Sequence, residues 1–253
     1  MQKEKILNFE VDSLNIQDCV DEIYSCICNG NSKYWLACIN PHSYAEACKD
    51  LCFQKALQSS NWLIPDGAGI VLASKFFKGS IKSRITGNDI FDGLNKKFEE
   101  TEGVDVFFLG SSESTLQQIE KRIKQDFSNI RVVGTYSPPF MDKFNEVELD
   151  LMRKAINKAK PQILWVGMSA PKQEKWIMDN IDYLDIKFAA AIGAVFDFYA
   201  GNIKRSNLIF QKSGLEWLPR LIQEPRRLWK RTFISAPKFL LDILKAKLQE
   251  MLT

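Results

Sequence analysis

Apolar runs and amphipathic stretches alternate along the first 201 residues of the chain. Short runs rich in β-branched and aromatic residues predict strands, here at residues 34–39, 61–64, 105–109, 131–135, 163–166 and 188–192. Longer segments with apolar positions on one face predict helices, at residues 43–59, 88–102, 114–127, 146–160 and 172–180. Strands that alternate with helices in this way are typical of an α/β domain with a largely parallel sheet.

Three of the predicted strands run directly into a glycine, at Gly110, Gly167 and Gly193, and each glycine is followed within two positions by serine or alanine. In a parallel sheet the carboxyl ends of the strands meet at one edge, where α/β proteins bind nucleotides. We therefore expect these three glycines to line a nucleotide site.

Basic charge is concentrated at the carboxyl-terminal end of the chain. Residues 202–253 hold eleven Lys and Arg against four acids, a net charge of +7, whereas residues 1–201 carry −4. We expect an α/β core over residues 1–201 and a basic amphipathic helical appendage over residues 202–253. Residues 214–231 are strongly amphipathic and contain Pro225, which breaks or kinks a helix. Composition leaves two interpretations equal, a terminal helix docked on the core and a surface for an anionic membrane or a diphosphate.

Length and composition narrow the class of protein. A chain of 253 residues with 45% hydrophobic and 26% charged residues is long enough for a sizeable core and is not disordered. Its apolar runs are shorter than the roughly 20 residues that span a bilayer, and the N-terminus does not resemble a signal peptide. We therefore expect a cytoplasmic protein. The six cysteines all precede residue 53 but lack zinc-site spacings, so free thiols are expected.

Asp66 is the leading candidate for a catalytic base. It lies between an apolar run that ends at Pro65 and a turn that contains Gly67 and Gly69. Glycines let the backbone adopt positive φ and let a ligand approach closely. Pro-Asp-Gly is also an ordinary turn sequence, and taken alone the alternative of an Asp bonded to its own turn is favoured.

Two further segments are suited to phosphate oxygens. Arg84 lies shortly before a predicted helix start at Asn88 or Asp89, and a surface arginine before an ordinary helix cap is an equal alternative. The second segment follows Gly167 and is a proline-started helix with Lys172 and Gln173 in its exposed first turn. Two interpretations are open, a turn that binds phosphate and a helix that is merely well capped.

Other chemistries are excluded by what the sequence lacks. A single histidine excludes a multi-histidine metal site, and no nucleophile elbow, Walker A motif or Gly-x-Gly-x-x-Gly fingerprint is present. No two aspartates are separated by one residue, so the Asp-x-Asp cation site of many sugar-nucleotide transferases is missing. We expect no metal and no cofactor, which leaves carboxylate and arginine chemistry.

Taken together, short motifs along nearly the whole chain resemble the WecG/TagA/CpsF family of bacterial glycosyltransferases, also termed glycosyltransferase family 26. The matching segments are residues 40–43 (NPHS), 65–67 (PDG), 84–89 (RITGND), 108–110 (FLG), 167–174 (GMSAPKQE), 193–197 (GAVFD) with Gly201, and 214–217 (GLEW) with Arg220 and 224–227 (EPRR). Their order and spacing match from about residue 6 to residue 231.

The resemblance implies a Rossmann-like core of the GT-E type, with a C-terminal appendage that closes the active site and contacts the membrane. It implies an inverting, metal-independent enzyme that moves a hexose-type sugar from a UDP-sugar to a polyprenyl-diphosphate-linked saccharide at the inner membrane face. Asp66 carries over as the base, Asn40 as its neighbour in the acceptor pocket, and Arg84 and Gln173 as active-site residues. Asp197 and the neighbouring glycines carry over to the nucleotide site.

The chain departs from the family pattern at two places. Cys38 stands where threonine is common, which affects a hydrogen bond to the sugar, and residues 205–207 (RSN) stand where Arg-Ala-Pro is common. The second departure concerns the hinge to the appendage.

The expected mechanism is a single displacement in which Asp66 takes a proton from the acceptor hydroxyl. Without a metal, protein donors must meet the charge on the leaving UDP, and Arg84 is a candidate with Arg220, Arg227 and Arg231 of the appendage. A Rossmann-type oxidoreductase or methyltransferase would need a glycine fingerprint that is missing. A non-enzymatic basic module that binds membrane or nucleic acid leaves Asp66 and Arg84 unexplained, so nucleic acid is not expected as a partner. Homo-oligomerisation stays open.

Overall fold

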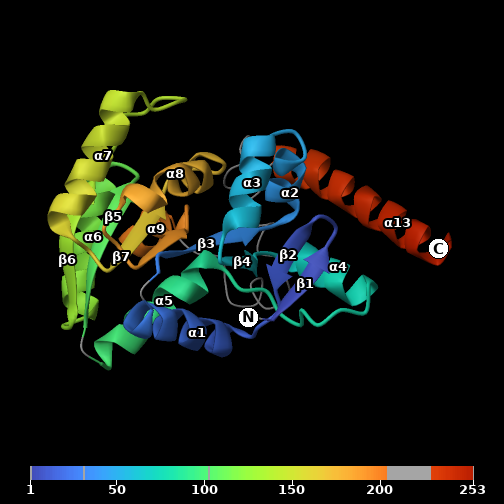
Figure 1. Cartoon of the computed structure of the whole chain (residues 1–253), viewed down its shortest axis with the longest axis horizontal. Coiled ribbons are helices and arrows are strands. Elements are labelled where there is room, and N and C mark those ends of the chain that lie inside the picture. Colours follow the sequence, from blue (N-terminus) through green and yellow to red (C-terminus); the bar gives the residue numbers. More distant parts are fainter. Residues whose placement is uncertain (1, 31, 102, 204–228, 253) are drawn as a thin grey trace. The chain divides into compact units, whose positions relative to one another are not determined.

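A six-stranded sheet and a separate two-stranded hairpin carry the fold (Figure 1). The structure is a computed structural model, and it describes residues 2–30, 32–101, 103–203 and 229–252. The strands of the large sheet are β3 (Tyr34–Ile39), β4 (Trp62–Pro65), β5 (Val104–Gly110), β6 (Ile130–Tyr136), β7 (Ile163–Gly167) and β8 (Phe188–Ala191). Their order is β4-β3-β8-β7-β5-β6, and the pairings from β3 through β8, β7 and β5 to β6 are parallel. Each of the six predicted strands is present, and the predicted Rossmann-like α/β class is confirmed.

Helices follow most strands. They are α1 (Ile16–Asn29), α2 (Pro41–Ala47), α3 (Leu51–Ser59), α4 (Ala68–Phe76), α5 (Gly87–Glu99), α6 (Glu113–Asp126), α7 (Glu146–Ala159), α8 (Lys172–Asn180), α9 (Val195–Ala200) and α13 (Ala236–Leu252). A 3₁₀ turn, η1 (Ile181–Tyr183), follows α8, and a π-helical turn, η2 (Arg231–Ser235), precedes α13. In the described part of the chain, no helix combines the length and the hydrophobicity needed to cross a bilayer.

Several predicted helices need correction. The single helix predicted over residues 43–59 is two helices, because the Asp50 side chain accepts a hydrogen bond from Phe53 N (3.1 Å) and starts α3 afresh. The helix expected after an Asn88 or Asp89 cap begins earlier, at Gly87. Sequence analysis missed α1, α4 and α9. The apolar sequence of α4 (AGIVLASKF) lacks a polar face, and α9 is only six residues long, so neither shows a clear helical period.

Contacts divide the chain into two compact units, of which the first comprises the described residues of segments 1–15, 38–86 and 204–253. Its hairpin pairs β1 (Lys3–Ile6) with β2 (Phe9–Asp12), and the Asp12 carboxylate accepts a hydrogen bond from Leu63 N (2.6 Å). Tyr44 of α2 stacks edge-on against Phe9 and Phe239, whose ring centroids lie 6.2 and 5.2 Å away. These rings join the hairpin, α2 and α13 in one core.

The second unit comprises the described residues of segments 16–37 and 87–203. In this unit α7 packs on β5 and β6, α6 on β6 and α9, and α1 on α5. The core is aromatic, with edge-to-face pairs that link Phe91 to Phe108 and Trp165, and Phe108 to Phe196. Such pairs add about 0.5–1.5 kcal/mol each beyond the burial of their area. The rings connect α5, β5, β7 and α9 in one core.

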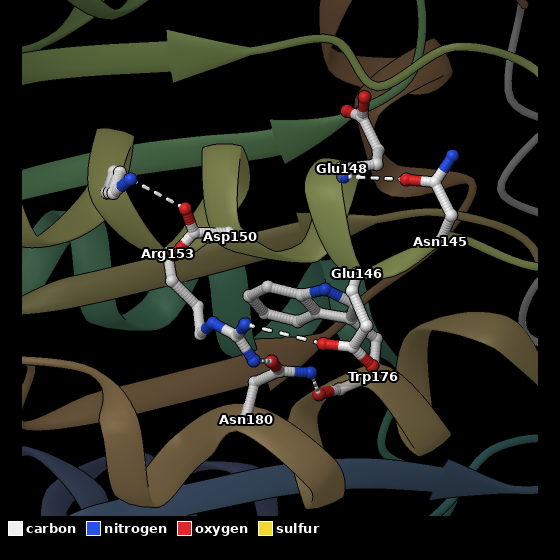
Figure 2. Close-up of polar contacts among 8 residues, drawn as sticks. Asn145, Glu146, Glu148, Asp150, Arg153, Trp176 and Asn180 are labelled. Carbon is white, nitrogen blue, oxygen red and sulfur yellow. Dashed lines mark hydrogen bonds and ion pairs between the residues drawn. The ribbon is translucent and has the colours of Figure 1, made fainter.

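Polar contacts tie α7 to α8 (Figure 2). Arg153 donates to Asn180 Oδ1 (3.2 Å) and lies 3.8 Å from a carboxylate oxygen of Glu146, and Asn180 Nδ2 donates to the carbonyl of Trp176 (2.8 Å). Asn145 caps the start of α7 by accepting from Glu148 N (2.9 Å). The last turn of α8 is therefore held in place against α7.

Candidate functional site

Asp66 lies directly after β4, a strand that is buried along its whole length. Its backbone N–H donates to the carbonyl of Ile39 at the end of β3 (2.8 Å), and the Asp66 residue is half-buried. Gly67 has φ +109°, a conformation that L side chains rarely adopt, and a Cβ there would lie 3.8 Å from Cβ of Asn40. The turn therefore brings Asp66 next to the residue that follows β3.

That residue, Asn40, is the N-cap of α2. Its Oδ1 accepts hydrogen bonds from the backbone N–H groups of His42 and Ser43, both at 3.0 Å. The Asn40 N–H in turn donates to Ser43 Oγ (2.7 Å), which completes a capping box. Among the described residues, Asn40 Nδ2 has no hydrogen-bond acceptor. The capping oxygen fixes the side chain, and the Nδ2 group can donate a further hydrogen bond.

The two functions of Asn40 are separable by mutation. Asn40→Ser keeps a capping oxygen but removes the amide donor, so we expect stability to stay within about 0.5 kcal/mol of wild type. We expect the catalysed rate to fall about tenfold or more if Nδ2 donates to a ligand oxygen, because that oxygen loses its donor. Thermal unfolding and initial-rate assays measure the two effects. Asn40→Ala, which loses the cap as well, is the comparison. Wild-type rates in the serine variant would contradict a role for Nδ2.

Arg84 is tied to the same turn. The N–H of the next residue, Ile85, donates to the carbonyl of Pro65 (2.9 Å), immediately before Asp66, and Arg84 is half-buried. Cys38 is half-buried in β3, two residues before Asn40. Four of the predicted site residues, Cys38, Asn40, Asp66 and Arg84, therefore lie on three adjacent backbone segments of the first unit. A carboxylate, an amide and a guanidinium on neighbouring segments have the chemistry to take a proton and to bind anionic oxygens.

The predicted glycines lie together in the second unit. Gly110 ends β5 and pairs in register with Gly167, which ends β7. Gly110 has φ +117°, and a Cβ there would lie 2.6 Å from the Gly167 carbonyl oxygen, so this approach requires glycine. After β8, the Gly193 N–H is shared between the carbonyl of Val166 (3.3 Å) and Oε1 of Gln173 (3.1 Å). The structure thus brings Gly110, Gly167, Gly193 and Gln173 to one edge of the β5-β7-β8 strands.

Asp197 lies in the first turn of α9, just after Gly193, and is half-buried. Its carbonyl accepts from the N–H groups of Asn202 and Ile203 (3.0 and 3.2 Å). These bonds turn the chain out of the short helix α9. Asp197 is the one carboxylate among the residues of the second unit that were predicted to bind the nucleotide.

Sequence analysis did not single out Glu174, which follows Gln173 and is 2% exposed. Gln173 Nε2 donates to Glu174 Oε1 (2.9 Å), and burial raises the pKa of Glu174 to about 7. An acid in the first turn of a helix is so common that its sequence position gives no indication of burial.

The C-terminal segment packs on α2, the helix that Asn40 caps. His42 Nδ1 lies 2.9 Å from Ser235 Oγ, Tyr44 donates to Asp242 Oδ2 (3.0 Å), and Lys230 pairs with Glu46 (3.2 Å). Burial, reinforced by the charge of Arg231, lowers the pKa of His42 to about 4. His42 is therefore neutral at pH 7 in this contact.

Of the three predicted arginines of the appendage, the structure describes one. Arg231 starts η2 and is half-buried, whereas Arg220 and Arg227 lie outside the described residues. The departure at residues 205–207 also lies outside them. Within the described ranges, no group of three or more His, Cys, Asp or Glu side chains could hold a metal ion.

Comparison with known proteins supplies the family. The model of the glycosyl transferase WecG/TagA/CpsF family matches residues 4–252. A Bacillus subtilis (strain 168) protein named N-acetylglucosaminyldiphosphoundecaprenol N-acetyl-beta-D-mannosaminyltransferase is 30% identical over 249 residues, 97% of this chain and 92% of the relative. A Staphylococcus aureus (strain MW2) protein of the same name is 26% identical over 248 residues, 97% of this chain and 93% of the relative. The chain belongs to the WecG/TagA/CpsF family of glycosyltransferases.

Proposed function

We propose that this glycosyltransferase moves a hexose-type sugar from a UDP-sugar to a saccharide carried on polyprenyl diphosphate, with inversion at the anomeric carbon. The observation that carries the proposal is the juxtaposition of Asn40, Asp66 and Arg84 on adjacent backbone segments. The names of the Bacillus and Staphylococcus relatives support the acceptor class, because both names include a sugar linked to diphosphoundecaprenol. The pathway is the assembly of a bacterial cell-surface polysaccharide.

The proposed reaction is a single displacement. The Asp66 carboxylate takes the proton of an acceptor hydroxyl while that oxygen attacks the anomeric carbon of the donor. The bond from the anomeric carbon to the UDP oxygen breaks, and its electron pair leaves with UDP. General base catalysis of this kind contributes about 10²–10⁴ in rate. Asn40 and Cys38 would bind the sugars beside the base.

The leaving UDP needs positive charge and hydrogen-bond donors. We propose that the strand ends at Gly110, Gly167 and Gly193, with Gln173 and Asp197, bind the nucleotide. The arginines Arg84, Arg220, Arg227 and Arg231 would stabilise the charge that develops on the diphosphate. We propose that no metal ion takes part, which is supported by the missing Asp-x-Asp motif.

The appendage over residues 202–253 is proposed to bind the inner face of the cell membrane and to close the active site of the 1–201 core. Support comes from α13, which buries Phe239 and Ile243 but leaves Leu240, Leu244 and Leu248 at least half exposed. Lys245, whose side chain is 74% exposed, adds positive charge to this helix. Apolar side chains next to lysine suit an anionic lipid interface. The protein would then be a cytoplasmic, peripheral membrane enzyme.

A ligand screen and a metal test check the proposed function. UDP should raise the thermal unfolding midpoint, whereas NAD, S-adenosylmethionine and RNA should not, because ligand at 100 times its Kd stabilises by about 2.7 kcal/mol. UDP release from a panel of UDP-sugars with a lipid-diphosphate acceptor should be the same with and without EDTA. Stabilisation by RNA but not by UDP would favour a non-enzymatic basic module. Activity lost in EDTA and restored by Mg²⁺ or Mn²⁺ would contradict metal independence.

A further inference from the structure

The first turn of α8 was expected to expose Gln173, but it contains two adjacent polar side chains that are almost completely buried. Gln173 is 5% and Glu174 is 2% exposed. Gln173 Oε1 accepts from the Gly193 N–H (3.1 Å), and Gln173 Nε2 donates to Glu174 Oε1 (2.9 Å). The three groups form a chain from the end of β8 to the interior side of α8.

The neighbours of Gln173 fix which end of its amide is oxygen. The backbone N–H of Gly193 can only donate, so the group facing it must be Oε1. Nε2 then faces Glu174 Oε1, which accepts whether or not the carboxyl group carries a proton on its other oxygen. An Nε2 group has two protons, and one of them is used here. The second has no acceptor in the described part of the chain.

Burial of the Glu174 carboxyl group costs free energy of desolvation. Its Oε2 atom is buried and has no hydrogen-bond partner in the described part of the chain, and burial raises the pKa of the carboxyl group to about 7. Trp176 Nε1, two residues further along α8, is likewise buried and unpartnered. A packed apolar side chain would avoid the desolvation of the carboxyl group. Two hydrogen bonds offset part of this cost, one from Gln173 Nε2 and one from the backbone of Glu174 itself.

We propose that Glu174 is a positioning residue that holds the Gln173 amide in the orientation in which its second Nε2 proton meets an anionic oxygen of the UDP-sugar. The inference rests on the proposed function for the place of Gln173 in the nucleotide site. The hydrogen bonds with Gly193 and Glu174 orient the Gln173 amide. A third hydrogen bond, from the remaining Nε2 proton, recognises a nucleoside diphosphate. The fixed last turn of α8 keeps this orientation from drifting with the helix.

The experiment separates the contact from the activity. Glu174→Met removes the acceptor at similar volume, whereas Glu174→Gln keeps a carbonyl acceptor and removes the charge. Asp179→Leu, an exposed position on the same helix, is the control. Exchange of the Gln173 side-chain amide protons, followed by ¹⁵N NMR, reports the contact directly. We expect exchange to be about tenfold faster or more in Glu174→Met, and close to wild type in Glu174→Gln and Asp179→Leu.

Kinetics then test whether Glu174 acts through Gln173. We expect Glu174→Met to raise the KM for the UDP-sugar about tenfold or more. The KM of Glu174→Gln should stay close to that of wild type. In a double-mutant cycle the combined variant Gln173→Met, Glu174→Met should be no worse than Gln173→Met alone. A merely structural glutamate would instead lower activity by the product of both effects.

The outcomes distinguish the inference from the proposed function. Unchanged amide exchange in Glu174→Met overturns the positioning role, whatever the activity. A second outcome is faster amide exchange in Glu174→Met together with normal UDP binding by Gln173→Met. This result overturns the ligand role of Gln173, and with it the proposed nucleotide site. If Glu174→Met does not fold, Glu174→Ala serves the same comparison.

Discussion

Asp66→Asn is expected to lower the rate of UDP release about 10²- to 10⁴-fold, because asparagine cannot take the proton of the acceptor hydroxyl. The substitution is nearly isosteric, and the hydrogen bond from the backbone N–H of residue 66 to Ile39 does not depend on the side chain. Folding and UDP binding should therefore stay close to wild type. The measurement is single-turnover sugar transfer with saturating donor and a lipid-diphosphate acceptor, which excludes product release from the rate.

The chain offers a matched control in Asp50→Asn. Asp50 belongs to the same unit and caps α3, and asparagine caps a helix as well as aspartate does. This variant should turn over normally. Turnover of Asp66→Asn within a few-fold of Asp50→Asn would remove Asp66 as the base, and Arg84 and Asn40 would then be left as binding groups only.

The ends of strands were the most predictable part of this protein. Buried parallel strands are short continuous apolar runs, and glycines after them mark where the chain must turn tightly. Gly110 and Gly167 were therefore found from the sequence, and their register pairing follows from the parallel sheet. The family resemblance implied that Asn40 lies beside Asp66. In the structure each residue comes directly after a strand, and the two strands are neighbours in the sheet.

Contacts between distant segments could not be predicted in this way. Ser235 lies 193 residues from His42 and Asp242 lies 198 residues from Tyr44, and helical periodicity carries no information about such partners. The sequence predicted a helical appendage over residues 202–253, but not that Phe239 of α13 packs on Tyr44. Glu174 was missed for a related reason, because its burial depends on α8 packing on β8 rather than on its own neighbours in sequence.

The docking of α13 changes how the proposed membrane surface must be tested. Removing the whole appendage would strip Phe239 and Ile243 from a core, so lost activity in a truncated chain would not identify a membrane contact. The triple variant Leu240→Gln, Leu244→Gln, Leu248→Gln changes only side chains that are 51%, 50% and 61% exposed. Burial of a leucine at the lipid interface contributes about 1.5–3 kcal/mol when complete, and about half of this is available for each half-exposed side chain.

We therefore expect the triple variant to bind anionic phosphatidylglycerol vesicles roughly 100-fold more weakly than wild type, measured by co-sedimentation. Its thermal unfolding and its transfer to a short-chain, water-soluble acceptor should be unchanged, whereas transfer to a long-chain acceptor in vesicles should fall. Leu51→Gln with Leu151→Gln, two exposed leucines outside α13, is the control for lost surface hydrophobicity. Vesicle binding equal to wild type would refute the membrane assignment. A concentration-dependent mass of the wild type that the triple variant loses would assign the same face to a second copy of the chain.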